Sequence, residues 1–289
     1  MSLKTVGVLG IGEMGTAVAH LLRNNGVRVV TSLEGRSSKT KANAITAGVE
    51  DLGSLEEVVR VSDLVLSMLS SKVAQDVAHL VGATAKTLGI RIIFGEFNAI
   101  APATVQAIEN DVGGSMDVVD GGIIGGPANL STATFYLSGP RANEVATLRN
   151  FGLNTRVLGD QVGQASGMKL CYAGMTKGLS TLALDLLLAA VTLGVEGPIL
   201  EQYQRSMPGV LHFVDRFIPG NPKRAVRRSE EMPEVGIMMD SLGFDGSIHR
   251  AAYKRMKWLG DLEMDTDGFP DATTVASHII NTINPELAV

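Results

Sequence analysis

The first half of the chain alternates between short continuous apolar runs and longer segments whose apolar residues have helical spacing. VGVLG at 6–10 is an unbroken apolar run that ends in glycine, as in a strand buried on both faces. GTAVAHLLRNNG at 15–26 then has helical periodicity and stops at Gly26. This alternation continues to about Gly159. We therefore expect an α/β domain with a parallel sheet covered by helices on both faces.

The same patterns predict the other elements of this domain. Further strands are expected at 27–33, 63–69, 90–97, 115–123, 133–139 and 154–159, with a strand or short connection at 48–52. Further helices are expected at 39–48, 54–62, 71–84, 103–111 and 141–152. Ser54, followed three residues later by Glu57, is a capping-box pattern for the helix at 54–62. A Gly/Pro loop, GGPANLS, separates the strands at 115–123 and 133–139.

From about Gly163 the apolar spacing is helical throughout. One long apolar segment covers 164–194. Amphipathic helices are expected at 197–217, 223–243, 246–262 and 270–283. The prediction is an α/β Rossmann-type N-terminal domain at 1–162 and an all-α C-terminal domain at 163–289, joined by a long interdomain helix.

Composition narrows the class of protein. Of 289 residues, 45% are hydrophobic and 19% are charged, so the chain can bury a large core and we expect no extensive disorder. The net charge is −5 and there is no long basic run, which argues against nucleic acid or an anionic membrane as a partner. The five histidines show no metal-ligand spacing, and we predict no metal site.

Cysteine content and the longest apolar run indicate the compartment. The single cysteine, Cys171, allows no internal disulfide, so a reducing compartment, the cytoplasm, is expected. We interpret Cys171 itself as a small core residue. The first residues lack the pattern of a signal peptide. The apolar run at 179–195 contains Asp185 and continues a helical pattern, so we predict a buried helix rather than a membrane span.

GIGEMG at 10–15 places three glycines between a predicted strand and a predicted helix. In a dinucleotide fingerprint, Gly10 would make the tight turn, Gly12 would let the backbone approach a pyrophosphate, and Gly15 would let helix and strand pack closely. The start of the helix would offer N–H groups to phosphate. The alternative is a glycine-rich turn without a ligand. We expect a dinucleotide, because the motif has the strand–turn–helix context that binding requires.

The end of the second predicted strand bears on the choice between NAD and NADP. Glu34 lies at about the distance expected of an acidic residue that reads the ribose 2′-hydroxyl of NAD. Arg36, Ser37, Ser38 and Lys39 follow it and together resemble a 2′-phosphate cradle. The alternative is a solvated loop. We predict NADP rather than NAD.

SGMKLCYAGMTKG at 166–178 surrounds Lys169 with small and apolar residues. On a helix, Tyr172, Ala173 and Thr176 would share its face. Lys169 could be a lysine that extends to solvent from a half-buried helix, or a general acid/base held in a cleft. Lys177 lies elsewhere around the helix, and we expect it at the surface or an interface.

Two further features of the sequence carry charged candidates. Asp120 ends a strand before two glycines, and we interpret it as a residue that orders the turn. Arg224, Arg227 and Arg228 could reach an anionic substrate or cover a wet helix face, and the wet face is the preferred interpretation.

Five stretches, in their order and spacing, resemble the β-hydroxyacid dehydrogenase family, which includes 6-phosphogluconate and 3-hydroxyisobutyrate dehydrogenases. VGVLGIGEMG is similar to the family's cofactor loop, and SDLVLSMLSS to the strand and loop that pass the cofactor's ribose. FNAIAPATV resembles a short loop that faces substrate or nicotinamide, and VDGGIIGGPA resembles the glycine-rich substrate loop. GQASGMKLCYAG lies where the family has its catalytic lysine. RRSEEMPEVGIMMDSLGF resembles a less characterised branch of the family.

The resemblance implies roles for individual residues. Lys169 matches the catalytic lysine. The residues predicted to bind substrate are Asn98, Gly121, Gly122, Gly125, Gly126 and Tyr172, the last from its place on the helical face of Lys169. The residues predicted to bind the cofactor, including those of the loop after the second strand, are Gly10, Ile11, Gly12, Glu13, Met14, Gly15, Arg36, Ser37, Ser38, Met68, Leu69 and Asn98.

The chain also departs from the family pattern at three places. Ile124 stands where many members have a serine that binds the substrate, and Ala173 stands where they have an asparagine one turn after the lysine. Glu230 and Glu231 lie where a lysine often begins a motif of the C-terminal domain. A standard 3-hydroxyisobutyrate or 6-phosphogluconate substrate is therefore not expected.

These inferences predict an NADP-dependent oxidoreductase that acts on a small, anionic hydroxy acid or the matching carbonyl compound, with Lys169 as general acid/base. Ile124 and Ala173 make an imine or carbonyl reductase with an apolar pocket the first alternative. A non-catalytic NADP-binding protein is the second. The family resemblance implies a homodimer, and a helix that also packs against a partner subunit would explain the length of the apolar segment.

Overall fold

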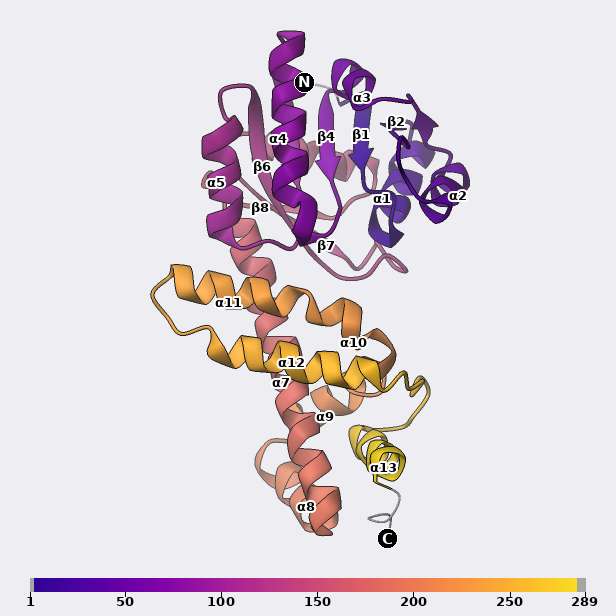
Figure 1. Ribbon diagram of the computed structural model, residues 1–289, viewed down its shortest axis with the longest axis vertical. Coiled ribbons are helices and arrows are strands. Elements are labelled where there is room, and N and C mark those ends of the chain that lie inside the picture. Colours follow the sequence, from indigo (N-terminus) through magenta and orange to yellow (C-terminus); the bar gives the residue numbers. More distant parts are fainter. Residues whose placement is uncertain (1–2, 285–289) are drawn as a thin grey trace. The chain divides into compact units, whose positions relative to one another are not determined.

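The computed structural model describes residues 3–284 and divides into two compact units, Met1–Leu170 and Cys171–Val289. The division falls inside the long helix α7 (Gln164–Leu193), which begins beside the predicted domain boundary and continues into the second unit (Figure 1). Each unit is described by itself below.

The first unit is built on one eight-stranded sheet with the order β3-β2-β1-β4-β5-β6-β7-β8. Its strands are β1 (Thr5–Leu9), β2 (Arg28–Thr31), β3 (Glu50–Asp51), β4 (Leu64–Ser67), β5 (Ile92–Glu96), β6 (Met116–Ile124), β7 (Thr134–Ser138) and β8 (Thr155–Gly159). Neighbours from β3 to β6 in this order are parallel. The predicted parallel sheet is confirmed from β3 to β6, and the next pair departs from it, because β7 runs antiparallel to β6. A short loop without a crossover helix can join only antiparallel neighbours.

Helices cover both faces of this sheet, as predicted. They are α1 (Glu13–Asn24), α2 (Ser38–Ala47), α3 (Leu55–Val61), α4 (Ser71–Leu88), α5 (Pro102–Val112) and the short α6 (Ala142–Val145). Residues of α1, α2 and α6 join one buried apolar cluster with the sheet, and residues of α3, α4 and α5 join another. In Figure 1, α4 and α5 lie in front of the strands. The two clusters explain the continuous apolar runs, because successive strand residues point to opposite, equally buried faces.

Local signals account for several helix ends. The Ser54 hydroxyl accepts the backbone N–H of Glu57 at 3.2 Å, which confirms the predicted start of α3. Gly48 and Gly89 end α2 and α4 in the left-handed conformation. The predicted helix at 141–152 is wrong in kind over most of its length, since a 3₁₀ segment, Ala146–Phe151, follows α6.

The second unit is all-helical. It contains most of α7 and then α8 (Glu196–Ser206), α9 (Pro208–Phe217), α10 (Asn221–Ser229), α11 (Glu231–Ser241), α12 (Ser247–Asp261) and α13 (Ala272–Ile283). Its main apolar cluster joins α7, α9, α12 and α13 through side chains such as Leu187, Ile218 and Ile279. All four predicted helical regions are present, although two of them divide.

The two divided regions have prolines at the break. The helix predicted at 197–217 separates into α8 and α9, because Pro208 lacks an N–H and suits the first position of a new helix. The helix predicted at 223–243 separates into α10 and α11. Pro233, in the first turn of α11, cannot donate a hydrogen bond back to α10, so one continuous helix is disfavoured.

α7 is the longest helix of the described chain. By length and composition alone, Gln164–Thr192 is the one helix among residues 3–284 that could cross a membrane, and 50% of its most apolar window is buried within the protein. Long core helices of globular proteins have the same composition, which agrees with the predicted buried helix.

Candidate active site

The candidate site lies at the carboxyl ends of the parallel strands. β1 has β2 on one side and β4 on the other, so the strand order reverses there. In open α/β sheets, ligands bind at the carboxyl ends of the strands beside such a switch point. The glycine loop follows β1, Met68 and Leu69 follow β4, and Asn98 follows β5. The sheet thus brings the predicted cofactor loops to one edge.

The three glycines of the first loop differ in their backbone surroundings, as the predicted fingerprint requires. Gly10 has a φ of +98°, and a Cβ there would overlap the carbonyl oxygen of Met68. A Cβ on Gly15 would overlap the carbonyl oxygen of Gly10, so only glycine lets α1 pack this closely on the turn. A Cβ on Gly12 would meet nothing within 4 Å. The tight turn, the open position and the close helix contact are those of a pyrophosphate-binding loop.

The start of α1 suits a phosphate group. Gly12 is the N-cap residue, no side chain caps the helix there, and a Cβ on Gly12 would meet nothing within 4 Å. An uncapped helix N-terminus carries a partial positive charge that attracts anions. Glu13 and Met14 form the exposed and half-buried first turn of the helix. Ile11 is buried, and its carbonyl oxygen accepts the side-chain amide of Asn43 at 3.1 Å. The loop is therefore held in shape by the protein itself.

Asn98 joins the loops after β4 and β5. It is 3% exposed; its Oδ1 accepts the backbone N–H of Leu69, and its Nδ2 donates to the Ser67 hydroxyl at 2.8 Å. Its own backbone N–H donates to Glu96 Oε1 at 2.8 Å. The amide thus has protein partners on both atoms, and its direct contact with substrate or cofactor stays a prediction.

The loop after β2 is open to solvent. Glu34, Arg36, Ser37 and Ser38 are all exposed, and the side chains of Glu34 and Arg36 have no partner within residues 3–284. Ser37 is the N-cap of α2, and its hydroxyl accepts the backbone N–H of Thr40 at 3.2 Å. This capping role, which the sequence analysis missed, places the start of α2 beside the predicted 2′-phosphate position.

The helix that carries Lys169 starts against the strand ends. Asp120, at 0% exposure in β6, accepts the backbone N–H groups of Gly163 and Ser166, each at 2.9 Å, and also the Ser166 hydroxyl. The Ser138 hydroxyl of β7 accepts the backbone N–H of Ala165 at 3.0 Å. Two strand side chains therefore cap the first turn of α7 from outside the helix. Asp120 orders a helix start rather than the turn that the sequence suggested.

Gly122 lets the first turns of α7 approach the sheet. A Cβ on Gly122 would overlap the carbonyl oxygen of Ala165 and would lie 3.0 Å from the Cβ of Lys169. Lys169 is half-buried at this position. The backbone of β6 thus fixes where Lys169 leaves the helix.

The predicted glycine-rich substrate loop falls into two parts. Gly121 and Gly122 lie inside β6, and a Cβ on Gly121 would overlap the ring of Phe97. Gly125 and Gly126 follow the strand and are exposed, and Gly125 has a φ of +132°. Close packing explains the first pair and also Gly125, where a Cβ would lie 2.6 Å from the Cα of Ala133. At Gly126 a Cβ would meet nothing within 4 Å.

Glu96 is a buried acid that the sequence analysis did not single out. It ends β5 at 0% exposure, pairs in register with Asp120, and its Oε2 has no hydrogen-bond partner among the described residues. Burial raises the pKa of Glu96 to about 8 and also raises the pKa of Asp120. A glutamate at the end of the apolar run IIFGEF was the available signal.

In the second unit, one expectation along α7 is wrong and another is narrowed. Cys171 is exposed rather than part of the core. Lys177, expected at the surface or an interface, is 6% exposed, so the surface alternative is excluded. Lys177 Nζ forms an ion pair with Glu231 Oε2 at 2.6 Å. Tyr172, at 44% exposure, leaves its ring accessible. The exposure of side chains therefore changes from residue to residue along this part of α7.

Two of the arginines of α10, Arg224 and Arg228, differ in their surroundings. Arg224 pairs with Asp267 at 3.0 Å on the surface, as a wet helix face predicts. Arg228 is turned inward, where it donates to Asn221 Oδ1 at 2.7 Å and lies over the Phe217 ring. Burial lowers the pKa of Arg228. Only part of this face is therefore wet.

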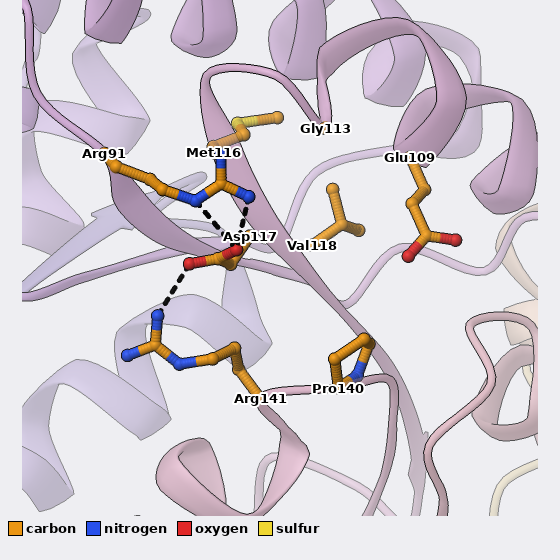
Figure 2. Close-up of a pocket in the computed structure, with 8 residues that line it drawn as sticks. All are labelled: Arg91, Glu109, Gly113, Met116, Asp117, Val118, Pro140 and Arg141. Carbon is orange, nitrogen blue, oxygen red and sulfur yellow. Dashed lines mark hydrogen bonds and ion pairs between the residues drawn. The ribbon is translucent and has the colours of Figure 1, made fainter.

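A separate pocket lies at the opposite edge of the sheet, where β5 and β6 begin (Figure 2). Asp117 lies between Arg91 and Arg141, with ion pairs of 2.6 Å to each. Although burial opposes it, hydrogen bonds from the two arginines lower the pKa of Asp117. None of the predicted site residues lines this pocket. Arg91, Asp117 and Arg141 form ion pairs with one another, and the pocket is separate from the candidate active site.

Two family models match parts of the chain. Residues 1–99 match the NADPH-binding domain of acetohydroxy acid isomeroreductase. Residues 190–259 match a domain of unknown function, DUF1932. The first match covers the strands and glycine loop described above.

Two relatives show the family. An uncharacterized 28.5 kDa protein of Methanothermus fervidus is 31% identical over 233 residues, which cover 80% of this chain and 88% of that protein. The conserved protein MTH1747, of unknown function and structurally similar to 3-hydroxyacid dehydrogenases, is 32% identical with a TM-score of 0.72; the match covers 89% of this chain and 97% of that one. The fold and its nucleotide-type loop define a two-unit, Rossmann-containing protein. The chain belongs to the β-hydroxyacid dehydrogenase-like family, which confirms the resemblance.

More distant structures share the fold alone. The 3-hydroxyisobutyrate dehydrogenase of Mycobacterium tuberculosis is 17% identical with a TM-score of 0.73, and the match covers 96% of this chain and 99% of that one. An imine reductase of Streptomyces aurantiacus is 18% identical with a TM-score of 0.56 at the same coverage. The predicted fold class is confirmed.

Proposed function

We propose that the protein is an NADP-dependent oxidoreductase that transfers a hydride between nicotinamide and a small hydroxy acid or the matching carbonyl compound. One observation carries the proposal. A single sheet edge holds the glycine loop after β1 and, through Asp120, the capped start of the helix that bears Lys169. Dehydrogenases and reductases among the structural neighbours agree with this class of enzyme.

The chemistry divides between cofactor and protein. The nicotinamide, when bound, supplies or accepts the hydride. Lys169 Nζ takes the proton of the substrate hydroxyl during oxidation and returns a proton to the carbonyl oxygen during reduction. The half-buried start of α7 suits this role, because the caps from Asp120 and Ser138 hold the first turn of the helix, and with it the backbone before Lys169, in place. Asp120, with its four donors, stabilises that start by charge.

The preference for NADP rests on the loop after β2. The guanidinium of Arg36 is exposed and without a side-chain partner in the described chain, and the N-terminus of α2 begins directly after it. Both features favour a phosphate dianion. Glu34 is the opposing feature, since a carboxylate would favour the 2′-hydroxyl of NAD.

The substrate is proposed to be a small anion. The exposed backbone at Gly125 and Gly126 and the accessible ring of Tyr172 can contribute contacts besides Lys169. Ile124 is half-buried and Ala173 is buried, so both family positions lack a polar group here. These two positions favour the second candidate, an imine or carbonyl reductase with a more apolar pocket. Parallel assays with hydroxy acids, oxo acids and cyclic imines separate the two.

The test of the main proposal is removal of the Lys169 amine. Lys169→Ala is expected to abolish turnover, about 10³-fold or more, while the NADPH dissociation constant changes by less than about threefold. Turnover is measured on the panel of substrates, and NADPH binding by its fluorescence. Lys86→Ala, at an exposed position of α4, is the matched control. Unchanged turnover would refute the role of Lys169, and sustained NADPH oxidation by the wild type would exclude a non-catalytic binding protein.

We further propose a cytoplasmic homodimer. Met175, Leu182, Leu186 and Leu193 of α7 are more than half exposed, and their spacing places them along one stripe of the helix. Such a stripe is typical of a surface that a second helix covers. A second copy of the chain is the proposed occupant.

A further inference from the structure

A buried row of polar side chains crosses the sheet near its carboxyl edge. Ser67, Glu96, Asp120 and Ser138 hold matching register positions on β4, β5, β6 and β7. Each has 0% exposure. Side chains in one register row point to the same face of a sheet, so the four form a line.

The two ends of the row reach different parts of the candidate site. At one end, Ser67 and Glu96 bind Asn98, whose Oδ1 holds the backbone N–H of Leu69. At the other end, Asp120 and Ser138 hold the first turn of α7. The row therefore connects a proposed cofactor loop with the helix that carries Lys169.

The row contains two carboxyl groups and supports one negative charge. Neither Glu96 nor Asp120 forms an ion pair with any lysine, arginine or histidine between residues 3 and 284. Asp120 accepts four hydrogen bonds, from two hydroxyls and two N–H groups at a helix N-terminus, all of which favour its charged form. Glu96 accepts one backbone N–H, and its Oε2 is buried without a partner. Burial beside Asp120 favours the neutral form of Glu96.

We propose that Glu96 is a positioning residue, a neutral acid that fixes Asn98 and thereby holds the Met68–Leu69 loop in register with the start of α7. It acts through Asn98 and touches no reacting atom. Ionised Glu96 places a second buried negative charge beside Asp120, and the two repel. The functional part of this inference rests on the proposed function, because it takes the Met68–Leu69 loop as a cofactor loop.

Thermal stability provides a test that needs no ligand. The pKa of Glu96 is about 8 in the native protein and starts from an ordinary value of 4.5. Between these values the native state binds one proton more than the unfolded state, so stability falls as pH rises, and above about pH 8 the effect is constant. Glu96→Gln does not titrate. The Tm of Glu96→Gln minus that of the wild type should therefore grow from about pH 5 to pH 8 and then level off.

Cofactor binding tests the positioning role. The NADPH dissociation constant of the wild type should rise about fivefold or more between pH 7 and pH 9.5, as Glu96 ionises in the native state. Glu96→Gln should bind NADPH with nearly wild-type affinity at pH 7, and its NADPH dissociation constant should not rise between pH 7 and pH 9.5. Glu96→Ala should weaken NADPH binding about tenfold at every pH, because Asn98 loses its anchor. Glu109→Gln, in the pocket at the opposite edge, is the matched control and should keep the wild-type pH profile.

A double-mutant cycle tests the route through Asn98. If Glu96 acts through Asn98, the effects of Glu96→Ala and Asn98→Ala on NADPH affinity should be non-additive, with the double variant no weaker than the weaker single variant. Additive losses overturn the proposal. So does a Glu96→Gln variant that binds NADPH as poorly as Glu96→Ala, or that retains the alkaline weakening.

The outcomes separate this inference from the proposed function. A wild-type protein that binds no NADPH refutes the cofactor assignment, and the Tm comparison then decides the role of Glu96 alone. In that case, the inference is supported if, at neutral pH, Glu96→Gln has a higher Tm than the wild type and Glu96→Ala has a lower one. Parallel Tm–pH curves for the wild type and Glu96→Gln overturn it whatever the cofactor result.

Discussion

At the scale of single residues, the candidate site separates side chains whose polar atoms face the protein from those that face solvent. Both atoms of the Asn98 amide have partners in the protein, and Asp120 is fully engaged by the start of α7. Glu34 and Arg36, by contrast, are exposed beside the N-terminus of α2. We therefore expect the buried group to set shape and the exposed group to choose between cofactors.

The choice of cofactor gives a prediction for Arg36. A charge-assisted pair with the 2′-phosphate is worth roughly 1.5–3 kcal/mol, so Arg36→Ala should weaken NADPH binding about 10–100-fold and NADH binding by less than about threefold. Titration of each cofactor by fluorescence measures both constants. Glu34→Ala is the paired variant and should leave the preference for NADPH intact or increase it. Equal losses for both cofactors after Arg36→Ala would contradict the assignment.

Residue roles were predictable from the sequence where they depend on neighbours in the chain. Gly10 makes the predicted tight turn and Gly15 the predicted close helix contact, because the turn and the start of the helix lie within six consecutive residues. The pairing of Glu96 with Asp120 depends on the register of two strands, and the ion pair of Lys177 with Glu231 joins two distant helices. Neither register nor helix packing can be read from one sequence, so both were missed.

At the scale of elements, prolines and glycines explain both the successes and the errors. Strand and helix order was predictable because apolar periodicity is strong. The divisions at Pro208 and before Pro233 were missed because the amphipathic pattern continues across them. The antiparallel direction of β7 was missed because a strand buried on both faces has the same continuous apolar pattern whether it runs parallel or antiparallel to its neighbour.

The placement of α7 against β6 gives a prediction for Gly122. Gly122→Ala puts a methyl group on the backbone oxygen of Ala165, which cannot rotate away, so the first turn of α7 must shift. We expect a loss of about 1–3 kcal/mol in the free energy of unfolding and a fall in turnover larger than the change in NADPH affinity. Chemical denaturation and steady-state kinetics measure these. Gly114→Ala, at an exposed position where a Cβ meets nothing within 4 Å, is the control and should behave as wild type. A silent Gly122→Ala would refute the close packing.

At the scale of the whole molecule, the exposed stripe of α7 is the feature that one chain leaves uncovered. Met175 and Leu182 are seven residues apart, as are Leu186 and Leu193, and these side chains are 51–73% exposed. Isolated exposed leucines are common on protein surfaces, whereas a stripe with this period on one helix favours a helical partner.

The proposed dimer predicts a change of mass when the stripe is charged. Leu182→Glu together with Leu186→Glu should convert a particle of twice the chain mass into one of single mass, because burying two carboxylates in an apolar interface is strongly unfavourable. Sedimentation equilibrium measures the mass, and far-UV circular dichroism shows whether the helices persist. Leu80→Glu, at a site 56% exposed on α4, is the control and should leave the mass at twice that of one chain. A wild type of single mass at micromolar concentration would refute the dimer, and a double variant that stays dimeric would place its interface elsewhere than on α7.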